Sequence, residues 1–233
     1  MPGFLLIDKP VGWTSFDVVA KLRRITGEKR IGHAGTLDPF ATGLLVVGVG
    51  REATRELGKL MGHEKEYAAT ARLGATSDTQ DLTGTIVETP VYAEIAAGRA
   101  NVPIPTREQI EAALENFRGE ISQIPPMYSA KKIGGQKLYD LARAGQIVER
   151  EPRRVTIREF ELLDYAWPEL KFRVTCSAGT YVRTLAHDLG QALGCGAYLT
   201  ELRRARSGDF RVEDAQKIEN LTPGNWRDRL IPV

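Results

Sequence analysis

Residues 32–43 read GHAGTLDPFATG, and this stretch decides how the rest of the chain is interpreted. Asp38 is the only acidic residue between Glu28 and Glu52. Glycine permits a left-handed backbone and a close approach to a ligand, and Pro39 disfavours helical geometry at Asp38. The sequence therefore predicts a stiff, irregular loop that carries one carboxylate. From these residues alone, a simple turn in which Asp38 hydrogen-bonds its own backbone is the favoured interpretation.

The apolar run LLVVGVG at residues 44–50 follows this loop and predicts a buried strand. Further strands are predicted at residues 4–7, 66–73, 156–163, 170–176 and 198–206, with a hairpin partner at 85–87. Residues 66–73 and 170–176 alternate with period 2, so Tyr67, Ala69, Ala71 and Leu73 are expected to share one face.

Helical spacing predicts helices over residues 15–27, 51–61, 106–119, 180–193 and 212–218. Ser15 and Thr180 are the expected N-caps, and Thr106 with Gln109 forms an expected capping box. Arg183 falls in the first turn of its helix, where the helix dipole disfavours a cation, so a carboxylate partner is expected. Residues 90–105 show no clear pattern. The chain therefore has mixed α and β character.

Composition excludes several classes of protein. The chain has 233 residues, of which 42% are hydrophobic and 27% charged, and this is ordinary for a globular protein with a sizeable core. Cys176 and Cys195 form no CxxC pair, and the three histidines show no metal-ligand spacing, so we expect neither a disulfide framework nor a metal. The apolar run in residues 1–10 is too short for a signal peptide, and no other run is long enough to cross a membrane, so we expect a cytoplasmic protein.

The net charge of +2 does not by itself indicate a nucleic-acid partner. Such a partner must be inferred from where the charged residues lie in the sequence. Cations gather just before the Asp38 loop, at Lys21, Arg23, Arg24, Lys29 and Arg30. Such a run suits contacts with phosphates, although a solvated helix face has the same composition. Residues 123–151 combine prolines, a Gly-Gly pair, tyrosines and cations including Lys131, which is typical of a mobile arm that closes on RNA.

Five stretches together resemble the bacterial tRNA pseudouridine synthase B (TruB) family. They occur in the family's order, at residues 9–15 (KPVGWTS), 32–45 (GHAGTLDPFATGLL), 65–81 (KEYAATARLGATSDTQD), 125–132 (PPMYSAKK) and 179–190 (GTYVRTLAHDLG). The resemblance implies an α+β pseudouridine synthase fold, with a central mixed, mostly antiparallel sheet flanked by helices and loops. It implies an enzyme without a cofactor that isomerises the uridine at position 55 of the tRNA T-loop to pseudouridine. A monomer is the default expectation.

The resemblance also assigns roles to single residues. Asp38 matches the family's essential aspartate, which acts at the bond between ribose C1′ and the base as nucleophile or as base. Arg183 matches the arginine that pairs with this aspartate, and Tyr67 matches the tyrosine that stacks on the target base. Taken alone, Tyr67 could be a core aromatic residue, and Arg183 could pair structurally with Asp188 or Glu201.

Further positions match residues around the substrate. By resemblance, Lys9, Lys65 and Leu202 shape the pocket, and His33 lies near the flipped nucleotide, although a histidine bonded to loop backbone would look the same. Lys131, in the arm at residues 123–151, is expected to contact the substrate. Phosphate contacts are expected from the basic helix, from this arm, and from Arg203, Arg204 and Arg206.

Three alternatives stay open at this stage. The first is a non-catalytic tRNA-binding or tRNA-folding protein on the same fold. The second is a guide-RNA pseudouridine synthase of the archaeal or eukaryotic type, and the third is a pyrimidine-processing hydrolase that releases free uracil. We expect a single catalytic domain over residues 1–233 without the C-terminal PUA module that many family members carry.

Overall fold

The computed structural model describes residues 2–98, 104–129, 132–133, 136–137, 146 and 148–233. The chain divides into two compact units. Unit 1 comprises residues 1–68 and 202–233, and unit 2 comprises residues 69–201. Strands β4 (Lys65–Leu73) and β12 (Ala197–Ser207) each contain residues of both units.

Unit 1 is built on three strands near the N-terminus: β1 (Gly3–Lys9), β2 (Ile31–His33) and β3 (Thr42–Val49). β1 and β2 both pair antiparallel with β3, and the end of β12 pairs parallel with the start of β3. The helices α1 (Ser15–Thr26) and α2 (Arg51–Met61) complete the N-terminal part. The C-terminal part adds β13 (Phe210–Arg211), η1 (Val212–Asp214), β14 (Gln216–Lys217), η2 (Ile218–Asn220), η3 (Trp226–Arg229) and β15 (Ile231–Pro232).

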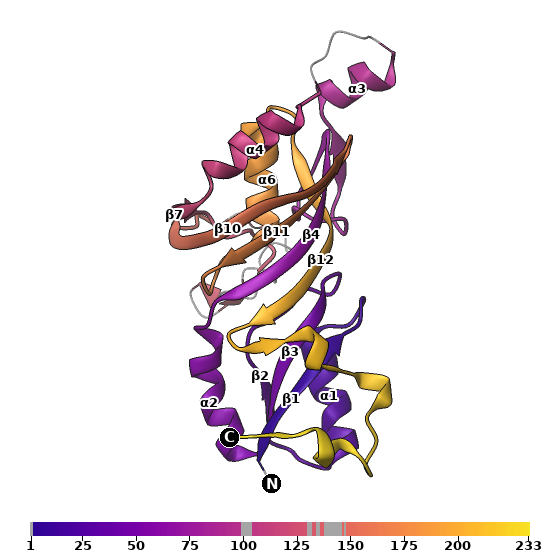
Figure 1. Ribbon diagram of the computed structural model, residues 1–233, viewed down its shortest axis with the longest axis vertical. Helices are drawn as coiled ribbons and strands as arrows, with labels where there is room; N and C mark the ends of the chain where they lie inside the picture. Colours follow the sequence, from indigo (N-terminus) through magenta and orange to yellow (C-terminus); the bar gives the residue numbers. More distant parts are fainter. Residues whose placement is uncertain (1, 99–103, 130–131, 134–135, 138–145, 147) are drawn as a thin grey trace. The chain divides into compact units, whose positions relative to one another are not determined.

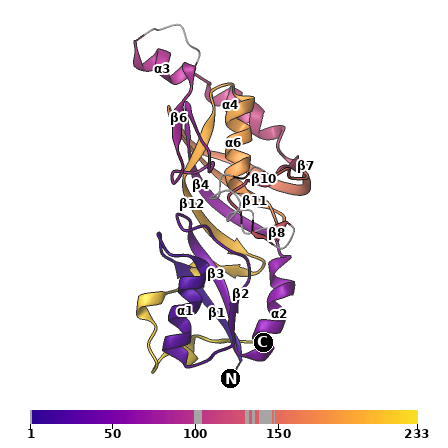
Figure 2. The same cartoon turned by 180° about the vertical axis from the view of Figure 1, so that it is seen from behind.

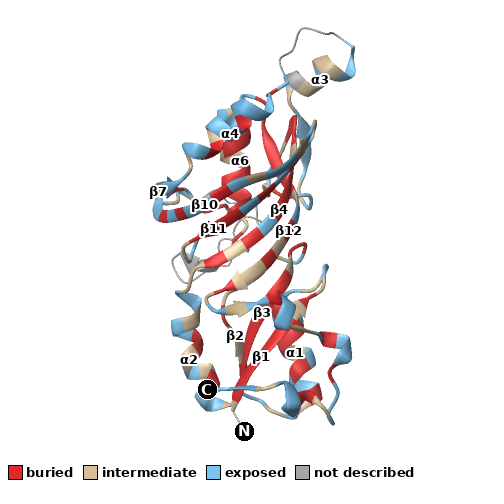
Figure 3. Cartoon of the chain, in the orientation of Figure 1, coloured by how far each residue is buried: buried red, intermediate tan, exposed pale blue. Residues whose placement is uncertain are grey.

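Alternation along β1 explains why unit 1 has a core on each face of its strands. Leu5 and Ile7 pack with the inward side of α1, whereas Phe4 and Leu6 pack with α2. Both helices flank the strands in Figure 1, and Figure 3 shows β1 and β3 as almost wholly buried. A strand buried on both faces is apolar throughout, which is why residues 44–50 form an unbroken apolar run.

α1 begins with a capping box, in which the Thr14 side chain accepts from the Asp17 N–H and the Asp17 carboxylate accepts from the Thr14 N–H. The predicted N-cap, Ser15, is therefore wrong by one residue. Gly27 ends the helix with a left-handed backbone, as predicted, at φ 71°.

Unit 2 contains the sheet order β12-β4-β11-β10-β7, from β7 (Gly119–Gln123), β10 (Arg153–Ala166) and β11 (Glu169–Cys176). The short strands β5 (Ala75–Ser77) and β6 (Ile86–Glu88) form a hairpin, and β8 (Lys132–Ile133) pairs with β9 (Gln136–Lys137). The helices are α3 (Pro90–Ala96), α4 (Arg107–Glu115) and α6 (Val182–Ala192). Figure 2 shows α4 and α6 together against the strands.

Aromatic packing fills the core of unit 2. Phe160 of β10 contacts Phe172 of β11 edge-on, with ring centroids 5.1 Å apart, and Phe117 lies 6.4 Å from Phe160. α6 contributes buried Leu185 and Leu189. Its N-cap is Tyr181 rather than the predicted Thr180. Most strand pairs of the two units are antiparallel, while β1 with β14 and β3 with β12 are parallel, so the predicted α+β class with a mixed sheet is confirmed.

Candidate active site

Asp38 lies on an irregular loop of unit 1 between β2 and β3, as predicted, and it is half-buried. Its neighbours Leu37, Phe40 and Ala41 are buried in the core. The Ala41 N–H donates to the Asp38 carbonyl oxygen at 3.1 Å, which closes a turn. The backbone of the loop is therefore fixed by packing while the carboxylate keeps partial access to solvent.

A second segment, residues 10–15, is hydrogen-bonded to the Asp38 loop. The buried Ser15 hydroxyl accepts from the Leu37 N–H at 2.9 Å and lies 3.3 Å from the Leu37 carbonyl oxygen. The Gly12 N–H donates to the Pro39 carbonyl oxygen at 2.8 Å. These bonds fix the backbone on both sides of Asp38, so the position of its Cα is set by two segments that are distant in sequence.

Lys9 links the segment at residues 10–15 to the Asp38 loop. It is fully buried at the end of β1, and its Nζ donates to the carbonyl oxygens of Pro10, Trp13 and Pro39 at 3.0, 2.6 and 3.3 Å. Burial lowers the pKa of Lys9 from 10.5 to about 8, while attraction to Asp38 opposes this shift. Lys9 therefore holds the loop and also places a positive charge near the carboxylate.

Arg204 of β12 is the largest fully buried side chain among the described residues, with 1% of its surface exposed. Its Nε donates to the Leu44 carbonyl oxygen at 2.7 Å and its Nη2 to the Gly35 carbonyl oxygen at 3.1 Å. The expectation that Arg204 contacts RNA phosphates is therefore wrong, because its guanidinium lies inside unit 1. The alternation of β12 was the signal that could have placed it, since Arg204 follows buried Leu202 by two residues.

Two glycines let the loop approach Arg204 closely. Gly43 has φ 95°, and a Cβ there would lie 2.4 Å from the Arg204 carbonyl oxygen. Gly35 has φ 89°, and a Cβ there would lie 3.4 Å from Arg204 Nη1. Only glycine fits the first position, because any side chain would overlap the backbone of β12.

Arg203 and Arg206, also expected to contact phosphates, each bind a carboxylate of unit 1. Arg203 makes two hydrogen bonds to Asp8, at 2.9 and 2.8 Å, and its side chain remains 43% exposed. Arg206 donates to Glu64 at 2.9 Å and lies 3.5 Å from Glu66. Both guanidinium groups are thus already paired within the protein, which raises the pKa of each.

His33 and Lys65 lie near the same arginine. Burial and then the charge of Arg204 lower the pKa of His33, so the imidazole is neutral at pH 7. Its Nδ1 is buried and has no hydrogen-bond partner among the residues that the structure describes. Lys65 Nζ donates to the Met61 and His63 carbonyl oxygens, and its Cε would lie 3.8 Å from a Cβ at Gly35.

Tyr67 and Leu202 are buried side chains on neighbouring strands, β4 and β12. Tyr67 shares the inward face of β4 with the other residues predicted for that face, Ala69, Ala71 and Leu73. Its burial at 8% exposure fits a core aromatic residue and also a ring that lines a site. The structure therefore brings Lys9, His33, Asp38 and Lys65 around Arg204 and the loop, and places Tyr67 and Leu202 in the same unit.

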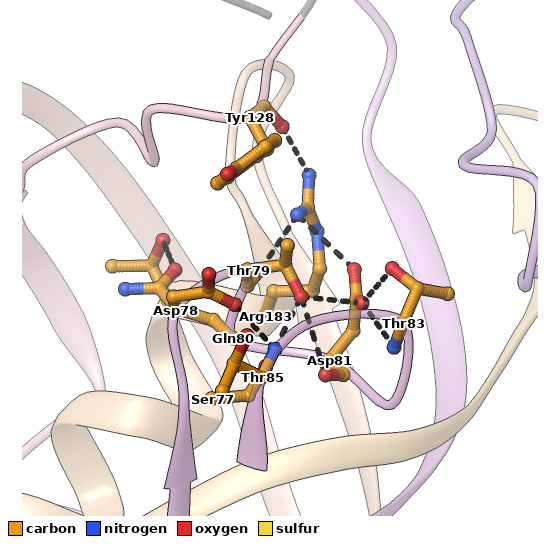
Figure 4. Close-up of polar contacts among 10 residues, drawn as sticks. Ser77, Asp78, Thr79, Gln80, Asp81, Thr83, Thr85, Tyr128 and Arg183 are labelled. Atoms are coloured by element: carbon orange, nitrogen blue, oxygen red, sulfur yellow. Dashed lines mark hydrogen bonds and ion pairs between the residues drawn. The ribbon is translucent and has the colours of Figure 1, made fainter. Parts of the chain in front are cut away.

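Arg183 belongs to unit 2, in the first turn of α6, as predicted. It forms a buried ion pair with Asp81, with Nη1 and Oδ2 3.2 Å apart and both side chains 4% exposed. Nη1 also donates to the Thr79 carbonyl oxygen, and Nη2 donates to the Tyr128 carbonyl oxygen, each at 2.8 Å (Figure 4). The carboxylate partner expected for a cation in this first helical turn is thus present. It is Asp81, whereas the sequence suggested Asp188 or Glu201 as the structural partner.

Asp81 is held as firmly as its partner. Its Oδ1 accepts from the Thr79 hydroxyl at 2.8 Å and from the Thr83 N–H and hydroxyl at 2.9 and 2.5 Å (Figure 4). Glu201, one of the two structural partners proposed for Arg183, instead accepts from the Thr70 hydroxyl at 3.0 Å. Lys131 and much of the predicted arm lie outside the described residues.

Comparison with known proteins agrees with the motifs. The family model described as TruB family pseudouridylate synthase (N terminal domain) matches residues 23–182, and the tRNA pseudouridylate synthase B C-terminal domain matches residues 183–229. The fold and the site thus define a pseudouridylate synthase. More narrowly, the chain belongs to the TruB family.

Curated relatives extend over nearly all of the chain. A tRNA pseudouridine synthase B of Chlamydia abortus is 51% identical over 91% of this chain and 85% of its own length. That of Protochlamydia amoebophila is 50% identical over 99% of this chain and 84% of its own. That of Opitutus terrae is 48% identical over the whole chain and 93% of its own.

A solved structure supports the fold. A chain of the Cbf5-Nop10-Gar1 complex superposes with a TM-score of 0.70 at 32% identity, over 96% of this chain. This chain spans about half of that one, 54%. The curated relatives are more identical to this chain, and it covers a larger share of their own length, so they favour the bacterial tRNA enzyme over the guide-RNA alternative. In the described part of the chain, no helix has the length and apolarity needed to cross a membrane.

Proposed function

We propose that this chain converts uridine 55 in the T-loop of tRNA to pseudouridine, with Asp38 as the catalytic carboxylate. The chain is a tRNA pseudouridine synthase of the TruB family, which is an isomerase. The observation that supports the role of Asp38 most strongly is the anchoring of its loop. A partly accessible carboxylate sits on a backbone that is hydrogen-bonded on both sides and packed into the core.

The reaction needs no external group donor. The bond between ribose C1′ and N1 of the base breaks, the base rotates, and a bond forms between C1′ and C5, after which the C5 proton leaves. An ionised carboxylate can stabilise or trap the positive charge that develops at C1′. Lys9 is attracted to the carboxylate of Asp38 and donates a hydrogen bond to the Pro39 carbonyl oxygen. It therefore favours an anion at Asp38 and fixes the backbone that carries this side chain.

The remaining assigned residues surround this step. We assign Tyr67 to stacking on the target base, and Leu202, Lys65 and His33 to shaping the space around it. The neutral state of His33 suits contact with an uncharged base edge. The family resemblance assigns Arg183 a catalytic role, and Lys131 a contact with the RNA. Both assignments stay predictions, and an Arg183→Lys variant with reduced turnover would support the first.

Access to the base requires that the uridine leave the loop of the tRNA. Flipping a base costs a few kcal/mol, which stacking and edge hydrogen bonds must offset. The exposed cations of α1 and the residues after it suit phosphate contacts that hold the T-loop by shape rather than sequence.

The test is tritium release from an unmodified tRNA transcript labelled at C5 of its uridines, without added metal. We expect release that requires the T-loop uridine and stops when this uridine is replaced by cytidine. Binding of tRNA without release would support the non-catalytic alternative and contradict the proposal. Release of free uracil would identify a hydrolase instead.

A further inference from the structure

We propose that Arg204 is a positioning residue for the reaction, which holds the Asp38 loop in its working geometry from inside unit 1. This inference rests on the proposed function, because it assigns Arg204 a role through Asp38. It concerns a residue that the sequence placed on the RNA-binding surface and that the structure places under the loop.

The contacts of Arg204 bracket the loop. Its Nη2 reaches the carbonyl oxygen of Gly35, three residues before Asp38, and its Nε reaches that of Leu44, six residues after it. Its own backbone lies opposite Gly43 in the parallel pair of β3 and β12. One side chain therefore joins the start of the loop to its end, and displacement of either end breaks a hydrogen bond.

The burial of this cation argues for a role beyond packing. A guanidinium in the protein interior is costly unless it is paired, and the hydrogen bonds of Arg204 within the described chain go to backbone carbonyl oxygens. Arg203 and Arg206 on the same strand bind carboxylates instead. A residue chosen only for stability at this position would be apolar, as Leu202 is.

The charge of Arg204 also reaches two residues of the candidate site. It contributes to the lowered pKa of His33 and of Lys9. The same guanidinium thus fixes the loop by hydrogen bonds and adds a positive charge beneath it. Arg204 does not need to touch the RNA to affect the step at C1′, because a small displacement of Asp38 is enough to slow it.

The experiment compares Arg204→Lys, Arg204→Met and the control Arg211→Met, an exposed arginine on β13. Single-turnover tritium release at saturating tRNA, the Kd for tRNA and the melting temperature are measured for each. The lysine keeps the charge but cannot reach both carbonyl oxygens in the same fork. We expect Arg204→Lys to fold, to bind tRNA with a Kd within about 2-fold of wild type, and to react about 10-fold more slowly.

Arg204→Met should lose about 100-fold in the same rate, again with little change in Kd. A folded Arg204→Lys protein with the wild-type rate would overturn the proposal, as would a loss of folding in both variants, since Arg204 would then act on stability alone. An equal loss in Arg211→Met would also overturn it. Failure of wild type to release tritium would instead contradict the proposed function, so the two failures are distinguishable.

Discussion

Unit 1 and unit 2 both bury basic side chains beside a loop, and they stabilise them in different ways. Lys9 and Arg204 donate to backbone carbonyl oxygens, so the positive charge in unit 1 is solvated by dipoles. Arg183 in unit 2 faces the carboxylate of Asp81, so the two charges offset each other. Dipoles leave a positive potential that an anion can use, whereas an ion pair mainly fixes geometry.

The largest effect on stability should come from breaking the ion pair of unit 2. Asp81→Ala removes the buried carboxylate that faces Arg183, and we expect the free energy of unfolding to fall by about 3–5 kcal/mol. The matched control is Glu161→Ala, which removes the exposed partner of Arg173 and should cost less than about 1 kcal/mol. Urea unfolding of both variants measures the difference. Equal costs would mean that the Asp81 pair is no more important than a surface one.

The next largest loss of stability should come from adding a side chain at Gly43. Gly43→Ala combines a positive φ with a Cβ 2.4 Å from the Arg204 carbonyl oxygen, and we expect a loss of about 3 kcal/mol. Gly27→Ala has a similar φ of 71° with nothing within 4 Å, so it should lose only about 1 kcal/mol. If both alanines cost the same in urea unfolding, the close approach of β3 and β12 is not what requires glycine.

The charge on Lys9 can be tested through pH. Its folded pKa of about 8 lies below the unfolded value of 10.5, so the unfolded state binds more protons between these values. Stability from this group therefore increases as pH rises from 8 to 10.5, by up to about 1 kcal/mol per pH unit. We expect wild type to gain stability relative to Lys9→Met over this range. Lys59→Met, which alters an exposed lysine, should show no such trend relative to wild type.

The smallest losses of stability should come from the two capping boxes, which should differ in their effect on the reaction rate. Thr14→Ala and Thr106→Ala each remove an N-cap and should each cost about 1 kcal/mol. Only Thr14 adjoins Trp13, whose carbonyl oxygen binds Lys9, so only Thr14→Ala should slow tritium release, by about 2- to 3-fold. A similar slowing in Thr106→Ala would show that the rate follows stability rather than the anchoring of the loop.

Local patterns predicted most of the longer helices and strands, and missed most of the short ones. The helix at Arg51–Met61 has the bounds that its spacing indicated, and β11 alternates from Glu169 to Val174, beyond which Thr175 is buried as well. The capping box at Thr106 was visible in the sequence. α3 was missed although Pro90 at its start is typical of a first helical turn, because its seven residues are too few to show a period. The helix predicted at 212–218 was wrong, since two 3-10 turns and a short strand occupy this region.

The candidate site was predictable where it depends on neighbours in sequence. Glycine and Pro39 around Asp38 indicated the irregular loop that the structure contains. The partners of buried charges were not predictable, because Asp81 lies about a hundred residues from Arg183 and the acceptors of Arg204 are backbone atoms with no signature in sequence. A run of cations does not by itself reveal which members point inward, and in β12 only the alternation with buried Leu202 indicates that Arg204 does.

The most direct test of the role of Asp38 is single-turnover tritium release by Asp38→Asn at saturating tRNA. Asparagine keeps the size of the side chain and removes its charge, so we expect the rate to fall by at least about 10³-fold while the Kd for tRNA stays within about 2-fold of wild type. Asp228→Asn, an exposed carboxylate of the same unit, should react as wild type does. An Asp38→Asn protein that released tritium at the wild-type rate would contradict the assignment of Asp38 as the catalytic residue.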